Sequence, residues 1–255
     1  MYYNVGMPKA KQQEYQDFAR EHFGFEFNDI SLFITALTHK SYAHEHKILG
    51  SHNERLEFLG DAILEVVTSD YLFRNYSLPE GIMTGLRSAL VNTESIGDAS
   101  EKLGYLKLTR LGHGEGSRSV DHAHPKFHAD CFEAVVGAIY LDQGYNTALQ
   151  FINKHIIVKL PEILENETWR DPKSLLQEIS QRLYTESPIY QLVTMSGPDH
   201  DRSFTMRVIV TGTVYGIGSG HSKQDATIRA AQVAVRRLKD EGLYKPKVFK
   251  KIKNV

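Results

Sequence analysis

The chain has 255 residues, 41% of them hydrophobic, which is enough to bury one large core or two modest ones, and its single cysteine, Cys131, excludes an internal disulfide framework and a cysteine-based zinc cluster. It contains no apolar run of membrane-spanning length and no secretory leader pattern, which predicts a cytoplasmic protein with no membrane partner. The net charge of -1 conceals an uneven distribution, because residues 171–255 carry 14 Lys and Arg against 8 Asp and Glu.

The first part of the chain, residues 12–160, has mostly helical patterns. Apolar residues recur at helical spacing in three long stretches, 54–76, 92–103 and 129–141, which Gly- or Pro-bearing breaks separate. Residues 112–125, rich in Gly, Ser and His, predict a surface loop. We therefore expect an all-α domain, and its excess of acidic residues suits the binding of cations.

The remaining part of the chain predicts a small α+β domain. Pro161, Asn166 and Pro172 bracket a polar segment, so we expect a linker over residues 161–171. An α-β-β-β-α order follows within residues 172–241, in the stretches 172–184, 190–194, 203–211, 213–218 and 226–239. Residues 242–255 contain five lysines and predict a mobile basic tail. The basic balance of this half favours contact with a phosphate backbone, with ordinary variation of surface charge as the alternative.

Two pairs of carboxylates form the main candidate site. On a helix, Glu57 and Asp61 are four residues apart and point from one face, and Asp130 and Glu133 lie three residues apart at the edge of an apolar run. A solvated acidic helix face is the alternative for the first pair taken alone. Four such carboxylates can hold Mg²⁺, a hard cation that prefers oxygen ligands. Such a site suits phosphodiester hydrolysis, because bound metal ions activate water and stabilise both the attacking and the leaving oxygens.

The segment ERLEFLGD, residues 54–61, resembles the sequence motif of the ribonuclease III family almost letter for letter. Supporting blocks follow the order of that family at residues 37–42, 86–92, 129–134 and 137–142, and the resemblance covers about residues 23–238. It implies an all-α endonuclease domain at 12–160, followed by a small α+β double-stranded-RNA-binding domain at 172–241.

The resemblance also implies the activity. The family's catalytic, metal-binding acids fall on Glu57, Asp61, Asp130 and Glu133. They imply two-metal-ion hydrolysis of double-stranded RNA with Mg²⁺, for which Mn²⁺ can substitute, and no small-molecule cofactor. The expected products carry 5′-phosphate and 3′-hydroxyl ends, and the expected substrates are ribosomal RNA precursors and other structured RNA. Because one set of acids cuts one strand, we expect a two-fold homodimer. Arg87 resembles a residue near the RNA backbone, and a local ion pair is its alternative role.

The second domain resembles the double-stranded-RNA-binding domain in its three contact regions. The matching residues are Gln177, Glu178 and Gln181 for one minor groove, His200 for a second, and Ser222 and Lys223 for phosphates at a helix amino terminus. Local hydrogen bonding is the alternative for Glu178 and His200. The chain departs from the family pattern at Ile82, Gly85, His128 and Gln224, which affects the expected RNA contacts and local packing.

Two rival hypotheses come from other functional classes. A catalytically silent, RNA-binding or ribosome-associated relative would have the same fold, but it would be free to lose one of the four acids, and all four are present. A DNA-directed two-metal nuclease is disfavoured by the minor-groove residues of the second domain. We therefore expect an endoribonuclease.

Overall fold

The fold is taken from a computed structural model that describes residues 7–48, 51–112, 125–198 and 201–252. The chain divides into two compact units, one of residues 1–163 with 250–255 and one of residues 164–249. Within the described ranges, no helix has the length and apolar character needed to cross a membrane.

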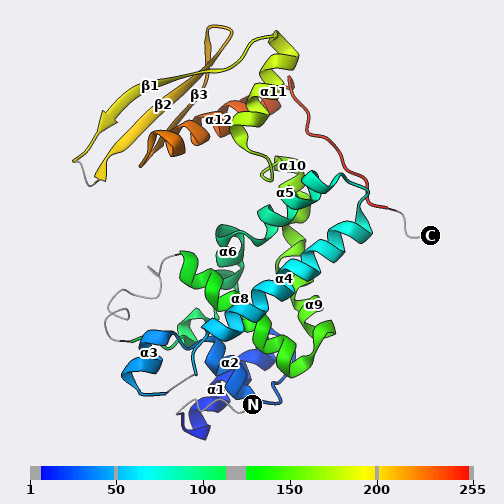
Figure 1. Cartoon of the computed structure of the whole chain (residues 1–255), viewed down its shortest axis with the longest axis vertical. Coiled ribbons are helices and arrows are strands. Elements are labelled where there is room, and N and C mark those ends of the chain that lie inside the picture. Colours follow the sequence, from blue (N-terminus) through cyan, green and yellow to red (C-terminus); the bar gives the residue numbers. More distant parts are fainter. Residues whose placement is uncertain (1–6, 49–50, 113–124, 199–200, 253–255) are drawn as a thin grey trace. The chain divides into compact units, whose positions relative to one another are not determined.

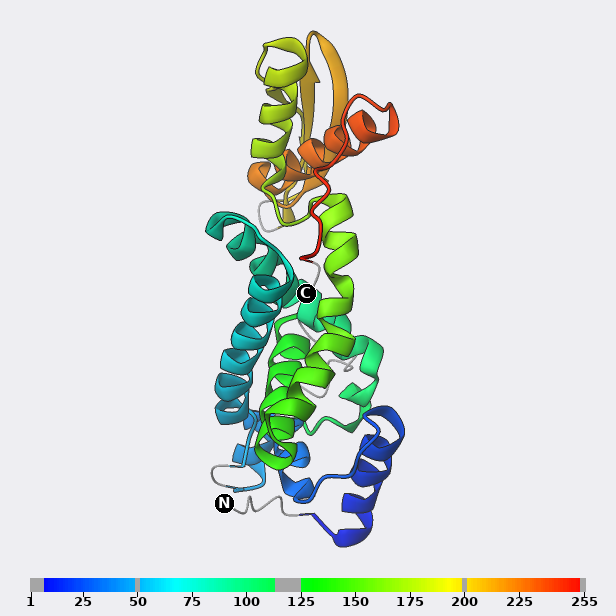
Figure 2. The same ribbon diagram turned by 90° about the vertical axis from the view of Figure 1, so that its right-hand side faces the viewer.

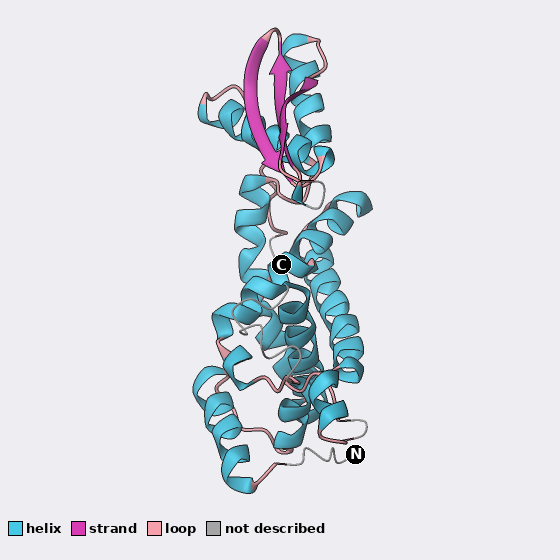
Figure 3. Ribbon diagram, turned by 90° about the vertical axis from the view of Figure 1, so that its left-hand side faces the viewer, coloured by secondary structure: helices cyan, strands magenta, loops and turns pink. Residues whose placement is uncertain are grey.

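The first unit is built of helices, as predicted (Figures 1 and 3). Its α-helices are α1 (Lys9–His22), α2 (Ile30–Ala36), α3 (Lys40–Glu45), α4 (Glu54–Asn75), α5 (Glu80–Val91), α6 (Thr93–Leu103), α8 (Pro125–Gln143) and α9 (Tyr145–His155). Among the described residues, the short 3₁₀ segments η1 (Tyr105–Leu108) and η3 (Ile157–Lys159) follow α6 and α9, respectively. Helix α10 (Leu160–Asn166) begins in this unit and covers the start of the segment predicted as a linker. Pro161 fits there because a proline is tolerated in the first turn of a helix.

Helices α4 and α8 pack closely at the centre of the unit (Figure 1). Gly60 of α4 makes this possible, because a Cβ atom placed on it would lie 1.7 Å from the backbone oxygen of Glu133. Gly137 of α8 faces the reciprocal restriction, with the backbone oxygen of Leu56 at 2.3 Å from its hypothetical Cβ. The two backbones therefore approach each other so closely at this crossing that only glycine fits at these two positions.

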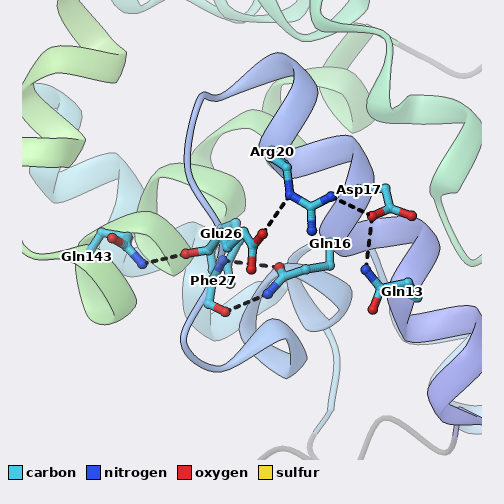
Figure 4. A network of polar contacts seen from close by, with 7 residues as sticks. All are labelled: Gln13, Gln16, Asp17, Arg20, Glu26, Phe27 and Gln143. Atoms are coloured by element: carbon cyan, nitrogen blue, oxygen red, sulfur yellow. Dashed lines mark hydrogen bonds and ion pairs between the residues drawn. The ribbon is translucent and has the colours of Figure 1, made fainter.

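A polar network fixes the other end of α8 to the loop after α1 (Figure 4). The side chain of Gln143 donates to the Glu26 backbone oxygen at 3.0 Å, and Arg20 of α1 pairs with the Glu26 carboxylate at 2.6 Å. Gln16 exchanges two hydrogen bonds with the backbone of Phe27, at 2.8 and 3.1 Å. The carboxyl end of α8 is thus anchored to the amino-terminal helix.

The second unit has the predicted α-β-β-β-α order (Figure 2). Its elements are α11 (Pro172–Tyr184), β1 (Ile189–Ser196), β2 (Ser203–Val210), β3 (Thr213–Gly220) and α12 (Lys223–Asp240). The strands form one antiparallel sheet in the order β1-β2-β3, with Gln191 opposite Arg207 and Arg207 opposite Ile217.

Alanines and glycines bring α12 onto the sheet. Ala226, Ala230 and Ala234 are fully buried, and hypothetical Cβ atoms on Gly216 and Gly218 of β3 would lie 2.3 Å from backbone atoms of Ala230. The glycines therefore serve helix-to-sheet packing. The other face of the sheet carries the side chains that alternate with buried Met206 and Val208, Arg207 among them.

Several boundaries differ from the prediction. Helix α8 begins at Pro125, four residues before the expected start, and α12 begins at Lys223 instead of Ala226. The first turn of α12 is polar and is capped by Ser222, so apolar periodicity alone places the start of this helix too late. Tyr244, in the segment predicted as a tail, is 5% exposed and donates its hydroxyl to the buried carboxylate of Glu167. The predicted domain limits and the mobility of the tail stay predictions.

Candidate metal centre and RNA-binding surface

The acidic residues of the centre come from α4 and α8, at the glycine crossing. The start of α4 is held by the backbone N–H of Asn53, which donates to the Thr38 backbone oxygen at 2.9 Å. Leu56 and Leu64 are 1% exposed and fix the inner face of the helix. Glu57 and Asp61 then lie along α4 beside the first turns of α8, which carry Asp130 and Glu133.

Three of the four predicted acids converge. Glu57, Asp130 and Glu133 can each offer a carboxylate oxygen so that these atoms all lie within 4.8 Å of one another. All three side chains are half-buried. Asp61 is exposed and lies outside this group of three, although its charge is one of those that raise the pKa of Glu133. Three of the predicted acids thus form one cluster, and Asp61 lies outside it, near enough for its charge to act on Glu133.

The electrostatics of the cluster favour a bound cation. Burial, followed by the charges of Asp61, Glu57 and Asp130, raises the pKa of Glu133 to about 8. Burial and the charge of Asp130 also raise the pKa of Glu57. Half-buried carboxylates that repel one another are costly to keep ionised without a counter-charge. Oxygen donors crowded in this way match the ligand preference of a hard divalent cation, so the residues present fit such an ion.

Lys126 was not among the predicted site residues, although its ammonium lies at this centre. Its Nζ is 2.8 Å from one carboxylate oxygen of Asp130 and 2.9 Å from the other. The sequence did contain a signal, because Lys126 and Asp130 are four residues apart. This spacing predicts a contact only if both residues belong to one helix, and the predicted helix began at residue 129. The predicted loop, residues 112–125, lies almost entirely outside the described ranges.

Arg87 lies in α5 and makes the local contacts given as the alternative to RNA binding. Its guanidinium pairs with Glu65 of α4 at 2.8 Å and donates to the Ser69 hydroxyl at 3.0 Å. The side chain is only 37% exposed, so these contacts fasten α5 to α4. Of the residues that depart from the family pattern, His128 is half-buried and its Nε2 has no hydrogen-bond partner among the described residues.

The predicted RNA contacts of α11 lie on its exposed face. Gln177, Glu178 and Gln181 are all exposed, while the neighbouring Leu176 and Ile179 are buried. Glu178 forms an ion pair with Arg170, which precedes the helix, and this contact lowers the pKa of Glu178. The sequence did not identify Arg170, because no helical spacing relates it to Glu178.

At the start of α12, the Ser222 hydroxyl accepts a hydrogen bond from the backbone N–H of Asp225 at 3.0 Å and so caps the helix. Lys223 is exposed beside this cap, where a cation adds to the anion-attracting N–H groups of a helix amino terminus. His200 lies outside the described residues. Whether any of these residues contacts RNA stays a prediction.

Known proteins resemble this chain over most of its length. A family model described as Ribonuclease-III-like matches residues 29–160, and a model of the double-stranded RNA binding motif matches residues 172–238. A protein named Ribonuclease 3 from Oceanobacillus iheyensis is 42% identical over 217 residues, which cover 84% of this chain and 94% of that protein. Its counterpart from Natranaerobius thermophilus is 43% identical over 220 residues, covering 86% and 94%.

Among solved structures, the nuclease domain of ribonuclease III from Campylobacter jejuni superposes with a TM-score of 0.51 at 34% identity. The match covers 57% of this chain and 98% of that one, whose description concerns flexibility in a region involved in dimer formation.

A helical domain with a carboxylate centre, joined to a double-stranded-RNA-binding fold, defines an endoribonuclease that acts on double-stranded RNA. The chain belongs to the ribonuclease III family. Members of that family generally use a divalent metal ion, and the cluster of Glu57, Asp130 and Glu133 is a possible site for one.

Proposed function

We propose that this chain hydrolyses phosphodiester bonds of double-stranded RNA with Mg²⁺ held by Glu57, Asp61, Asp130 and Glu133. The proposal includes two-metal-ion catalysis, products with 5′-phosphate and 3′-hydroxyl ends, and action on ribosomal RNA precursors and other structured RNA in the cytoplasm. The observation that carries it is the convergence of Glu57, Asp130 and Glu133 from two helices. The family resemblance supports the rest.

The protein's own residues would bind and orient. Glu57, Asp130 and Glu133 supply oxygen ligands from a rigid helix crossing, and Asp61 can complete the set from its exposed position one turn after Glu57. When bound, Mg²⁺ lowers the pKa of coordinated water and offsets negative charge on a phosphate. Because the glycine crossing fixes the backbone of both helices, the acids need only side-chain rotations to meet the ligand.

The direct test is a cleavage assay on long duplex RNA with and without Mg²⁺. We expect chelation to stop cleavage, Mg²⁺ or Mn²⁺ to restore it, and single-stranded RNA and duplex DNA to stay intact. The ends of the products are read by phosphatase sensitivity and ligation. Cleavage that persists after complete chelation would overturn the proposed mechanism, and cleavage of duplex DNA at an equal rate would overturn the substrate class.

Lys223 offers a test of RNA binding. Because it is exposed at the amino terminus of α12, we expect Lys223→Ala to remove one phosphate contact. Affinity for duplex RNA should fall about fivefold at moderate salt, and the slope of log K against log salt should decrease by about one. The measurement is a filter-binding salt titration.

Arg207→Ala is the matched control, because it removes the same charge from the outer face of the sheet, where Arg207 contacts Gln191. Equal losses in the two variants would mean that general charge, and not the position of Lys223, determines binding.

We also propose a homodimer formed by the first unit. Exposed apolar side chains follow one face of α4 at helical spacing, with Phe58 81%, Val66 57% and Phe73 72% exposed. Beside Phe58 lies a cavity of about 1080 Å³ whose lining is mixed, with Leu32, Leu59 and Leu141 among its apolar residues and His52, Glu54, Arg55 and Asp142 among its polar ones. An aromatic side chain next to a cavity with an apolar part is self-complementary across a two-fold axis, because each copy can place its ring in the cavity of the other.

Phe58→Asp tests this interface. A carboxylate in place of the ring would lose hydration against Leu32, Leu59 and Leu141 and would stand near the charges of Glu54 and Asp142, so we expect the dimer dissociation constant to rise at least about a hundredfold. Light scattering at micromolar concentration measures it. Ile217→Asp, at a residue 54% exposed on β3, is the control and should leave the dimer intact. A fully active wild-type monomer at that concentration would contradict the assembly.

A further inference from the structure

Lys126 places a cation inside the acidic centre. It lies in the first turn of α8, and its Nζ contacts both carboxylate oxygens of Asp130, at 2.8 and 2.9 Å. The Lys126 side chain is 65% exposed, whereas that of Asp130 is 23% exposed. The ammonium therefore approaches a half-buried carboxylate from the solvent side, on a long and flexible stem.

The other acids of the centre also act on this ammonium. The charges of Asp130, Glu57 and Glu133 all raise the pKa of Lys126, and Lys126 lowers the pKa of Glu57 and Glu133 in return. Lys40, which pairs with Glu54 at 3.0 Å, has a smaller effect on Glu57. Among the described residues, Lys126 is thus the principal counter-charge of the cluster.

We propose that Lys126 is a resident counter-ion of this centre, which neutralises Asp130 in the metal-free protein and leaves that carboxylate when a divalent cation binds. The inference rests on the proposed function, because it takes the acids as metal ligands. The ammonium contacts both oxygens of Asp130, so a divalent cation bound to either oxygen would lie close to this positive charge, and the two cations would repel each other. Lysine and metal therefore compete, and the exposed stem lets the ammonium depart without unfolding α8.

The competition predicts tighter metal binding when the ammonium is removed. In a calorimetric titration of the metal-free full-length chain with Mg²⁺ alone, we expect Lys126→Met to lower the dissociation constant about fivefold. Lys126→Arg, which keeps the charge, should stay within about twofold of wild type. Lys102→Met is the matched control, because Lys102 is 72% exposed and pairs with Asp98 of α6 at 2.9 Å, outside the four acids. If circular dichroism shows that Lys126→Met is misfolded, Lys126→Gln is used in its place.

A second readout follows the ammonium itself. Amine-reactive labelling with mass spectrometry should show that Mg²⁺ accelerates modification of Lys126 and leaves Lys102 unchanged. An unchanged affinity in Lys126→Met, or an unchanged labelling rate of Lys126 in saturating Mg²⁺, would overturn the inference while the proposed metal site stands. A wild-type chain that binds no Mg²⁺ would overturn both.

Discussion

Glu133→Gln is expected to reduce cleavage of duplex RNA at least about a hundredfold while leaving RNA affinity within about twofold of wild type. Glutamine has nearly the same size as glutamate, so the substitution preserves the helix crossing. It removes the negative charge and one anionic oxygen of Glu133, which is one of the three carboxylates that converge. RNA binding should persist because the expected contacts other than Arg87 lie in a separate compact unit, and Arg87 pairs with Glu65 and not with the acids of the centre. Initial cleavage rates and filter binding measure the two effects.

Glu101→Gln, at an exposed position of α6, is the control for the loss of one carboxylate. Wild-type cleavage by Glu133→Gln would show that this residue is not a ligand, whereas a parallel loss of RNA binding would indicate misfolding.

In the metal-free protein, Glu133→Gln should also change how the melting temperature depends on pH. Glu133 has a folded-state pKa of about 8, above its ordinary value of 4.5, so the folded state retains this proton more tightly than the unfolded state does. Its contribution to stability is therefore fully present below pH 4.5 and is lost as the pH rises to about 8. Glutamine does not ionise, so metal-free Glu133→Gln does not lose stability in this way as the pH rises. Its melting temperature should therefore exceed that of wild type at pH 9 and approach it near pH 4.5.

The sequence predicted the acids because their signals are local. Glu57 and Asp61, like Asp130 and Glu133, are related by spacing within one helix, and spacing of that kind can be read without a tertiary structure. Their convergence was a hypothesis that came from the ligand preference of Mg²⁺ and was strengthened by the family resemblance. The structure brings three of them into one group and leaves the exposed Asp61 outside it, a difference in side-chain direction that helical spacing does not determine.

Contacts between residues far apart in the sequence could not be predicted from residue spacing. The approach of Gly60 to Glu133 and the hydrogen bond of Tyr244 to Glu167 each join segments more than 70 residues apart. No periodicity relates such pairs. Gly216 and Gly218 illustrate the same limit, because only the packing of α12 shows why β3 requires glycine at these positions.

Gly60→Ala is expected to disrupt the proposed metal centre without changing any acid. The new Cβ would lie 1.7 Å from the backbone oxygen of Glu133 and 3.0 Å from the backbone nitrogen of Gly137, and neither backbone atom can rotate away. The two helices must separate, so we expect the free energy of unfolding to fall by about 3 kcal/mol. A displacement of about 1 Å between Glu57 and the acids of α8 should lower cleavage about a hundredfold in the molecules that stay folded.

Thermal unfolding and Mg²⁺ titration separate these two effects, because a displaced ligand set should also weaken metal binding at temperatures where the variant is fully folded. Gly81→Ala is the matched control, since no atom lies within 4 Å of the corresponding Cβ in α5 and alanine favours the helix there. If Gly60→Ala bound Mg²⁺ and cut RNA as Gly81→Ala does, the close approach of α4 and α8 would not be what positions the carboxylates. If it lost both properties while its secondary structure was retained, the glycine crossing would be as necessary to the centre as the acids that it brings together.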